Sequence, residues 1–186
     1  MIKLVERRGS WIQTYRGGQF WPLDPRVSEI HIEDIAHALS MACRYNGHCL
    51  EFYSVAQHSV LLARYVAPKY KLWALLHDAA EAYLSDVPRP LKASMPIYKA
   101  QEDALMKVIC ERFGLPPTMP EVVHECDTRI LMDERNALMR KPPADWKINV
   151  EPLGIKIIPQ HWRDAQRDFL FMFNSLRDDR RLYDEV

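Results

Sequence analysis

Apolar residues at helical spacing constrain the fold of this chain more than any other sequence feature. From residue 32 onward they recur three or four positions apart, which is the spacing of one face of an α-helix. The stripes predict helices that start near residue 32 and then cover about 55–67, 70–84, 95–113, 120–139 and 162–176. Two short runs flank Gly17-Gly18 and predict a β-hairpin. We therefore expect an all-α fold, a helical bundle with a small N-terminal β-hairpin.

The chain length of 186 residues favours one domain, 1–186, over two. Within it we expect a hairpin arm at 1–27, an irregular loop at 141–160 and a frayed, charged tail at 177–186. Ser54 and Ser94 are predicted N-caps, and Thr118 with Glu121 has the spacing of a capping box. Two prolines exclude 85–90 from a helix interior.

The charge balance excludes several classes of partner. The chain has 25 Lys and Arg and 25 Asp and Glu, so its formal net charge is zero. That balance argues against a nucleic-acid coat protein and against a polybasic membrane binder. No apolar run approaches the ~20 residues that a membrane span needs. We therefore expect neither nucleic-acid nor membrane binding.

The cysteines and the first residues indicate a cytoplasmic protein. None of the four cysteines, Cys43, Cys49, Cys110 and Cys126, forms a CxxC pair, so the usual cysteine spacing of a zinc site is absent. A chain of this size does not need disulfides, and reduced thiols are expected. The opening residues contain no apolar segment of the kind found in secretory signals.

Ionisable residues interrupt the apolar stripes at three places. His58 lies on the stripe of the second helix, His77, Asp78 and Glu81 lie in the third, and Asp127 lies on the inward stripe of the fifth. Taken singly, each is compatible with an ordinary structural role. A lone histidine on an apolar face is more often a hydrogen-bonded core residue than a metal ligand. The acids could equally lie on solvated helix faces.

Taken together, these residues indicate a metal site. His77, Asp78 and Glu81 are spaced three and four apart, so they project from neighbouring faces of one helix. Two imidazoles and two carboxylates that face one core are typical ligands of a divalent cation, which would neutralise the buried acids. Mixed nitrogen and oxygen ligands suit Mn, Co, Fe or Zn better than Ca.

The motifs that carry these residues resemble a known family. The order His58, His77-Asp78, Asp127 resembles the H…HD…D signature of the HD-domain phosphohydrolases. The sequences SVAQHS, LHDAAEAY and DVPRPLK around them are similar to the YfbR-like 5′-deoxynucleotidase branch, and most to its short phage and prophage members. The resemblance extends from about residue 11 to 127 and implies a single HD domain.

The resemblance assigns roles to individual residues. It implies that His58, His77, Asp78 and Asp127 hold a divalent metal ion, for which Mn, Co, Zn, Mg or Fe are candidates. The ion would lower the pKa of a bound water and polarise a phosphoryl group. Glu81 would then serve as general acid or base, by its spacing and by analogy.

The same resemblance points to further catalytic and substrate contacts. Asp86 matches a family acid near the nucleophilic water or the sugar, although a turn aspartate would be the simpler interpretation. Arg44 and Lys92 are candidate phosphate contacts because developing charge on phosphoryl oxygens needs cationic donors. His48 is a weaker candidate for phosphate or a second metal. For Arg44 and Lys92 a solvated surface position is about as plausible.

These residues lead to one functional expectation and several alternatives. We expect a metal-dependent 5′-nucleotidase that removes the phosphate of (deoxy)ribonucleoside monophosphates and works as a homo-oligomer. A dNTP triphosphohydrolase of the same fold, releasing triphosphate, is the first alternative. A di-iron oxygenase would need more ligands than the one spare histidine, His48. A non-catalytic, metal-stabilised binding module also stays open.

Overall fold

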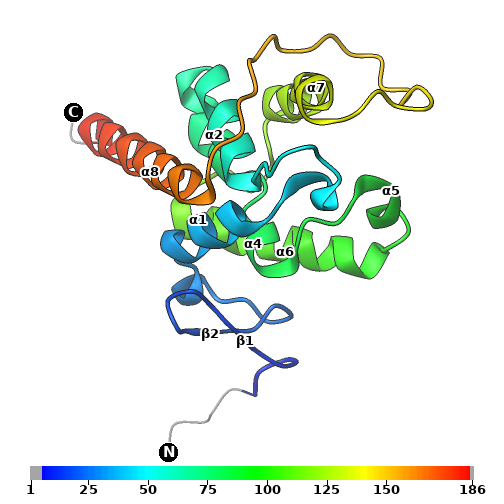
Figure 1. Ribbon diagram of the computed structural model, residues 1–186. Coiled ribbons are helices and arrows are strands. Elements are labelled where there is room, and N and C mark those ends of the chain that lie inside the picture. Colours follow the sequence, from blue (N-terminus) through cyan, green and yellow to red (C-terminus); the bar gives the residue numbers. More distant parts are fainter. Residues whose placement is uncertain (1–5, 185–186) are drawn as a thin grey trace, which may run out of the picture.

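The computed structural model describes the backbone of residues 6–184 and the side chains of residues 6–178. Its fold is mostly helical with a small two-stranded hairpin, as the sequence predicts (Figure 1). The helices are α1 (Ile32–Met41), α2 (Val55–Tyr65), α3 (Lys71–Leu76), α4 (Glu81–Leu84), α5 (Arg89–Lys92), α6 (Pro96–Phe113), α7 (Glu121–Leu138) and α8 (Trp162–Asp184). Short 3₁₀ turns occupy Val27–Glu29, Arg44–Gly47 and Pro68–Tyr70.

The hairpin pairs β1 (Ile12–Gln13) with β2 (Gln19–Phe20) in antiparallel register, Ile12 opposite Phe20. Such a short hairpin is not stable alone and must pack on other elements. Phe20 is completely buried, and its ring stacks on Tyr83 with centroids 4.1 Å apart. The Arg16 amide also donates to the Asp34 carboxylate in α1 at 2.7 Å. These contacts attach the hairpin to α1 and α4.

The main core lies among α1, α2, α3 and α8. It contains Ile35 and Leu39 of α1, Leu62 of α2, Leu75 of α3 and Phe169 of α8, all completely buried. A smaller core joins Tyr53, Leu138 and Ile157. The connection from α7 to α8 runs across one end of the molecule, where Figure 1 draws it in yellow to orange. No helix within residues 6–184 is long and apolar enough to cross a membrane.

The third predicted helix is interrupted, so the expectation of one helix over 70–84 is wrong. α3 ends at Leu76 and α4 begins at Glu81. Between them, backbone hydrogen bonds join residues three apart instead of the four of an α-helix. The Ala79 amide donates to the Leu76 carbonyl, and the Glu81 amide donates to the Asp78 carbonyl. His77 Nδ1 also lies 2.7 Å from the Ala74 carbonyl oxygen. The side chains of His77 and Asp78 thus project from a tightened turn between two helices.

Two of the predicted caps are wrong, and one is confirmed. Ser54 caps α2, since its Oγ accepts from the Gln57 amide at 3.1 Å. Ser94 does not cap α6, which begins at Pro96. Proline fits this first position because an amide there would have no partner within the helix. The Ser94 hydroxyl donates to the Leu91 carbonyl instead. Thr118 makes no capping bond, because the N-cap of α7 is Pro120.

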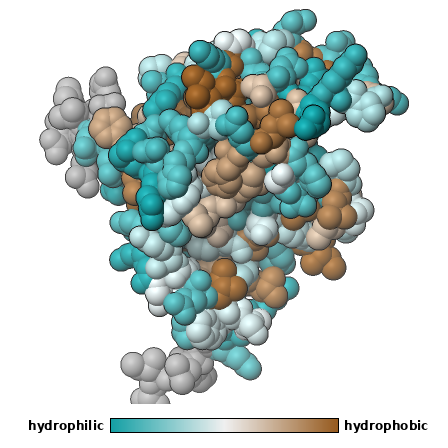
Figure 2. Space-filling model, viewed as in Figure 1, coloured by the Kyte–Doolittle hydropathy of each residue, from teal (hydrophilic) through white to brown (hydrophobic). Residues whose placement is uncertain are grey.

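The last helix is longer than the predicted 162–176. The α8 backbone is helical through Asp184, which includes most of the segment 177–186. Residues 185 and 186 lie outside the described part. The connection at 141–160 has no helix or strand, as expected. Apolar side chains that reach the surface form separate patches among polar ones on the face drawn in Figure 2.

Candidate metal centre

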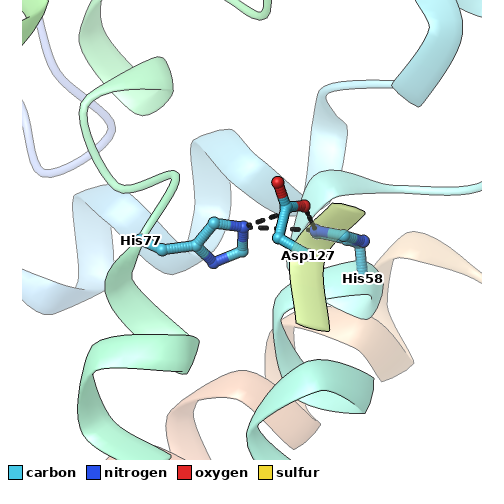
Figure 3. Close-up of side chains that lie close together, drawn as sticks. All are labelled: His58, His77 and Asp127. Carbon is cyan, nitrogen blue, oxygen red and sulfur yellow. Dashed lines mark hydrogen bonds and ion pairs between the residues drawn. The ribbon is translucent and has the colours of Figure 1, made fainter. Parts of the chain in front are cut away.

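Three side chains from three different elements converge on one point. His58 comes from α2, His77 from the turn after α3, and Asp127 from α7 (Figure 3). His58 Nε2 lies 3.2 Å from His77 Nε2 and 3.2 Å from Asp127 Oδ1. His77 Nε2 lies 3.6 Å from the same oxygen. The group could hold a metal ion.

The spacing of these atoms fits an ion at their centre. Two ligands with bonds of roughly 2.0–2.1 Å at a tetrahedral angle are about 3.3 Å apart. The three observed separations, 3.2, 3.2 and 3.6 Å, are close to that value. Three ligands of this kind would form one face of a tetrahedron and leave the fourth position open, which is typical of catalytic rather than structural zinc sites.

Hydrogen bonds on the far side of each ring set its tautomer. The carbonyl of Ala74 can only accept, so His77 Nδ1 carries the proton in their 2.7 Å bond. His58 Nδ1 likewise donates to the Glu134 carboxylate at 2.6 Å. In the neutral form of each ring, therefore, the Nε2 lone pair faces the centre. Two lone pairs and a carboxylate directed at one point require a positive charge between them.

The pKa values show the same need for positive charge. Burial opposes the charged form of His77, yet the carboxylates of Asp78 and Asp127 raise its pKa well above the ordinary range. Burial would raise the pKa of Asp127, but hydrogen bonds from His58 and His77 hold it well below its usual value. A bound cation can replace the extra protons that these rings otherwise carry.

Asp78, the fourth predicted ligand, lies at the edge of the group. Its Oδ2 is 3.2 Å from His77 Nε2 and 3.8 Å from His58 Nε2. Arg44 Nη1 lies 3.5 Å from the same oxygen. Burial would raise the pKa of Asp78, but the positive charge of His77 lowers it to about 2. This carboxylate therefore stays ionised beside the three central ligands.

Glu81 and Lys92 line a cavity that opens from the metal group. The cavity has a volume of about 450 Å³, and His77, Asp78 and Asp127 also line it. Glu81 is buried, and its Oε2 has no hydrogen-bond partner. Burial, with the negative charges of Asp78 and Asp86, raises the pKa of Glu81 to about 9. Lys92 Nζ lies 3.7 Å from Glu81 and 2.7 Å from Glu102.

The other predicted site residues differ in burial and in their contacts. Asp86 is half-buried; burial raises its pKa, while the charge of Arg44 lowers it. Arg44, a predicted phosphate contact, is buried, and its guanidinium pairs with the carboxylates of Asp78 and Glu134. The His48 side chain is exposed and lies outside the metal group. The exposed Arg89, to which the sequence assigns no role, pairs with Asp127 Oδ2 at 2.7 Å.

Glu134, which was not predicted from the sequence, connects the site to the core. This carboxylate is completely buried and binds His58, Arg44 and the hydroxyls of Tyr45 and Tyr53. Burial would raise its pKa, but Arg44 and His58 lower it to about 2. Glu134 follows Asp127 by seven residues, two turns of α7, so both lie on one helix face. That spacing is the signal that could have identified it.

The turn before α2 positions Arg44 and Tyr45. Tyr45 and Asn46 have φ of 55° and 53°, in the left-handed region that residues other than glycine rarely adopt. Two backbone hydrogen bonds hold the segment before the turn to the segment after it. The Arg44 amide donates to the Tyr53 carbonyl, and the Val55 amide donates to the Ala42 carbonyl. Left-handed residues of this kind are often found at functional sites.

Comparison with known proteins places the chain in a family. The uncharacterized protein YfdR of Escherichia coli K12 is 39% identical over 182 residues, covering 92% of this chain and 98% of the relative. The chain belongs to the YfdR family. An uncharacterized protein of Rhodobacter capsulatus is 38% identical to this YfdR-family chain over 121 residues, 60% of the chain and 62% of the relative. No family model matches the chain, and neither relative's name indicates an activity.

Proposed function

We propose that this YfdR-family chain is an HD-type, metal-dependent phosphohydrolase that removes the 5′-phosphate of (deoxy)ribonucleoside monophosphates. One observation carries the proposal. A cavity of about 450 Å³ joins the three-residue metal group to Glu81, a buried carboxyl with a partnerless oxygen. A volume in this range suits a small organic ligand.

His58, His77 and Asp127 would hold the ion, with Asp78 beside them. A divalent ion, when bound, supplies a Lewis acid for a phosphoryl oxygen and lowers the pKa of water. Glu134 fixes the His58 ring through the bond to Nδ1, and the Ala74 carbonyl does so for His77. Such bonds keep both Nε2 atoms directed at the centre.

The walls of the cavity divide into a charged and an apolar part. Lys92 supplies a cation close to Glu81, where a phosphate charge would be balanced. Trp73, Met106 and Met119 line the same cavity and offer apolar surface for a sugar and base. The resulting pocket would orient the phosphate toward the metal group and the nucleoside toward the apolar wall.

Hydrolysis forms a bond from a water oxygen to phosphorus and breaks the bond from phosphorus to the nucleoside oxygen. One proton must pass from the attacking water to the departing oxygen. We assign this transfer to Glu81, because it lines the same cavity as the metal group and its Oε2 has no other hydrogen-bond partner. Asp86 contributes negative charge that supports the raised pKa of Glu81.

The test is phosphate release from a panel of deoxyribonucleoside and ribonucleoside monophosphates by chelator-treated protein with Mn, Co, Mg or Zn added. We expect metal-dependent release that Asp78→Ala abolishes. Glu81→Gln should retain the metal but lose roughly 10²–10⁴-fold in rate. Glu125→Gln, an exposed acid on α7, is the control and should match the wild type.

The alternatives predict different products. Triphosphate released from a dNTP, without phosphate from monophosphates, would favour the triphosphohydrolase and overturn the monophosphatase. Turnover unchanged in Glu81→Gln would remove this residue from the mechanism. Absence of any product with every metal and nucleotide, by protein that still binds metal, would contradict the proposed activity.

A further inference from the structure

A second cavity lies between the hairpin and the helices, and it is lined by different residues from the metal cavity. We call it the hairpin pocket; its polar and aromatic walls are Thr14 and Tyr15 of the hairpin, Asp34 and His37 of α1, and Tyr83 of α4. Its volume is about 280 Å³. The proposed phosphohydrolase activity does not use this pocket.

Three residues that line the hairpin pocket each have one buried side-chain oxygen without a hydrogen-bond partner. These oxygens are Asp34 Oδ2, Thr14 Oγ1 and the Tyr83 hydroxyl, each inaccessible to solvent. Asp34 is only 3% exposed, and its other oxygen already accepts from the Arg16 amide at 2.7 Å. An unpartnered buried polar group costs about 1–3 kcal/mol, and more when charged. Three such groups on one cavity indicate a site built for a ligand.

The chemistry of these oxygens selects the kind of ligand. A carboxylate disfavours an anion, and a buried carboxylate favours a compensating positive charge. A primary ammonium group carries one positive charge and three N–H donors, which matches one carboxylate oxygen and two hydroxyl oxygens. The stacked rings of Tyr15 and His37, with centroids 3.8 Å apart, add an aromatic wall that favours a cation or an apolar tail.

We propose that the hairpin pocket binds a small organic molecule with a primary ammonium group, held by Asp34, Thr14 and Tyr83. The pocket has the volume of about nine water molecules, so it admits a short or singly aromatic amine. Tyr83 is two residues from Glu81 on α4. A ligand in this pocket therefore contacts the helix whose first residue lines the metal cavity.

The test uses two amines and their uncharged analogues. Propylammonium and 2-phenylethylammonium chloride are titrated into the full chain, with 1-propanol, 2-phenylethanol and potassium chloride as matched probes. Binding is followed by backbone amide chemical shifts in NMR. We expect saturable shifts at Arg16 and around Asp34 and Tyr83 with at least one amine, and at least tenfold weaker binding of its alcohol.

Single substitutions test the proposed contacts one by one. Asp34→Asn keeps an oxygen for the Arg16 amide but removes the charge, and should weaken amine binding at least tenfold. Tyr83→Phe and Thr14→Val should each weaken it about threefold to tenfold. Glu81→Gln, in the metal cavity, should leave amine binding unchanged. If Asp34→Asn does not fold, the amine affinity of Tyr83→Phe still tests the proposed binding site.

Several outcomes would overturn the proposal. Equal binding of the alcohols would show that the charge is not recognised, and equal shifts with potassium chloride would show a monovalent-cation site. Shifts confined to the residues around His77 and Glu81 would place the amines in the metal cavity. No saturable shift with either amine would mean that only water fills the hairpin pocket.

Discussion

Glu134 shows how one buried carboxylate organises several residues at the candidate metal centre. Its two oxygens accept from Tyr45, Tyr53 and His58 and pair with Arg44. Breaking a buried ion pair by removing one partner is strongly destabilising, because the other charge stays buried. Glu134 also fixes the tautomer of His58, so it acts on metal binding through that ring.

Glu134→Gln is expected to weaken divalent-metal binding 10–100-fold, the usual effect of losing an outer carboxylate behind a ligand histidine. It should also lower the free energy of unfolding by about 3 kcal/mol, because Arg44 loses its charge partner. Competition with a chromogenic chelator gives the first value and urea denaturation the second. Glu125→Gln is the control on the same helix. Unchanged metal affinity would show that Glu134 does not support the site.

Glu81 should make stability depend on pH in the metal-free protein. Its folded pKa, about 9, is above its ordinary value of 4.5. The protonated form therefore contributes stability that is complete below pH 4.5 and is lost as pH rises toward 9. Each pH unit in this window costs about 1.4 kcal/mol.

Glu81→Gln stays neutral, so it should lack this loss. Between pH 6 and pH 8, with chelator present, it should gain about 3 kcal/mol of stability relative to the wild type. Urea denaturation of both proteins at pH 6, 7 and 8 measures the difference. Parallel pH dependences would contradict the raised pKa of Glu81.

At the scale of elements, helix ends decide where the candidate ligands lie. α2 begins directly after its N-cap, Ser54, and His58 follows that cap by four residues. α3 ends one residue before His77, and the tightened turn that follows presents His77 and Asp78 to the centre. A helix that continued through this point would direct these side chains differently, since successive side chains rotate by about 100° around a regular helix.

Ser54→Ala removes the bond from the Gln57 amide and should lower the free energy of unfolding by about 1 kcal/mol. Ser94→Ala is the matched control: Ser94 caps no helix and bonds only to the nearby Leu91 carbonyl. Its effect should stay within about 0.5 kcal/mol. Urea denaturation measures both variants, and equal losses would contradict the assigned cap.

At the scale of the whole molecule, side chains of α2 and α7 hold the long connection between α7 and α8, and Arg129 of α7 donates to the carbonyls of Glu151 and Pro152. The Asp133 carboxylate accepts from the amides of Leu153, Gly154 and Ile155. Gln57 donates to the Ile158 carbonyl and accepts from the Gln160 amide. The connection is irregular, but it is held to α7, which carries Asp127, and to α2, which carries His58.

Asp133→Ala removes three hydrogen bonds to this connection. We expect faster cleavage within residues 141–160 by a low concentration of protease, because local opening becomes less costly. Asp145→Ala is the control in the same segment, where Asp145 accepts only from the nearby Lys147 amide. Mass spectrometry of the fragments locates the cuts. Equal cleavage of both variants would show that Asp133 does not fasten the segment.

The helical class, the hairpin and most helix positions follow from the amino-acid sequence alone. Apolar spacing, the cap at Ser54 and the glycine after Phe113 act over a few residues, so they can be recognised along the chain. The same periodicity placed His58 and Asp127 on inward faces, and His77 within the third helix. The ligand atoms of these three residues lie within 3.6 Å of one another, so the structure brings together three of the four metal ligands that the sequence predicts.

How these elements meet depends on tertiary contacts. The role of Glu134 and the burial of Arg44 rest on partners as far as 90 residues apart, and the interruption at His77 rests on bonds that compete with the regular helix. The partnerless oxygens of the hairpin pocket likewise come from segments that only packing brings together. Local sequence patterns carry no information on such contacts, because hydrogen bonding and charge pairing between distant segments depend on distance in space and not on spacing along the chain.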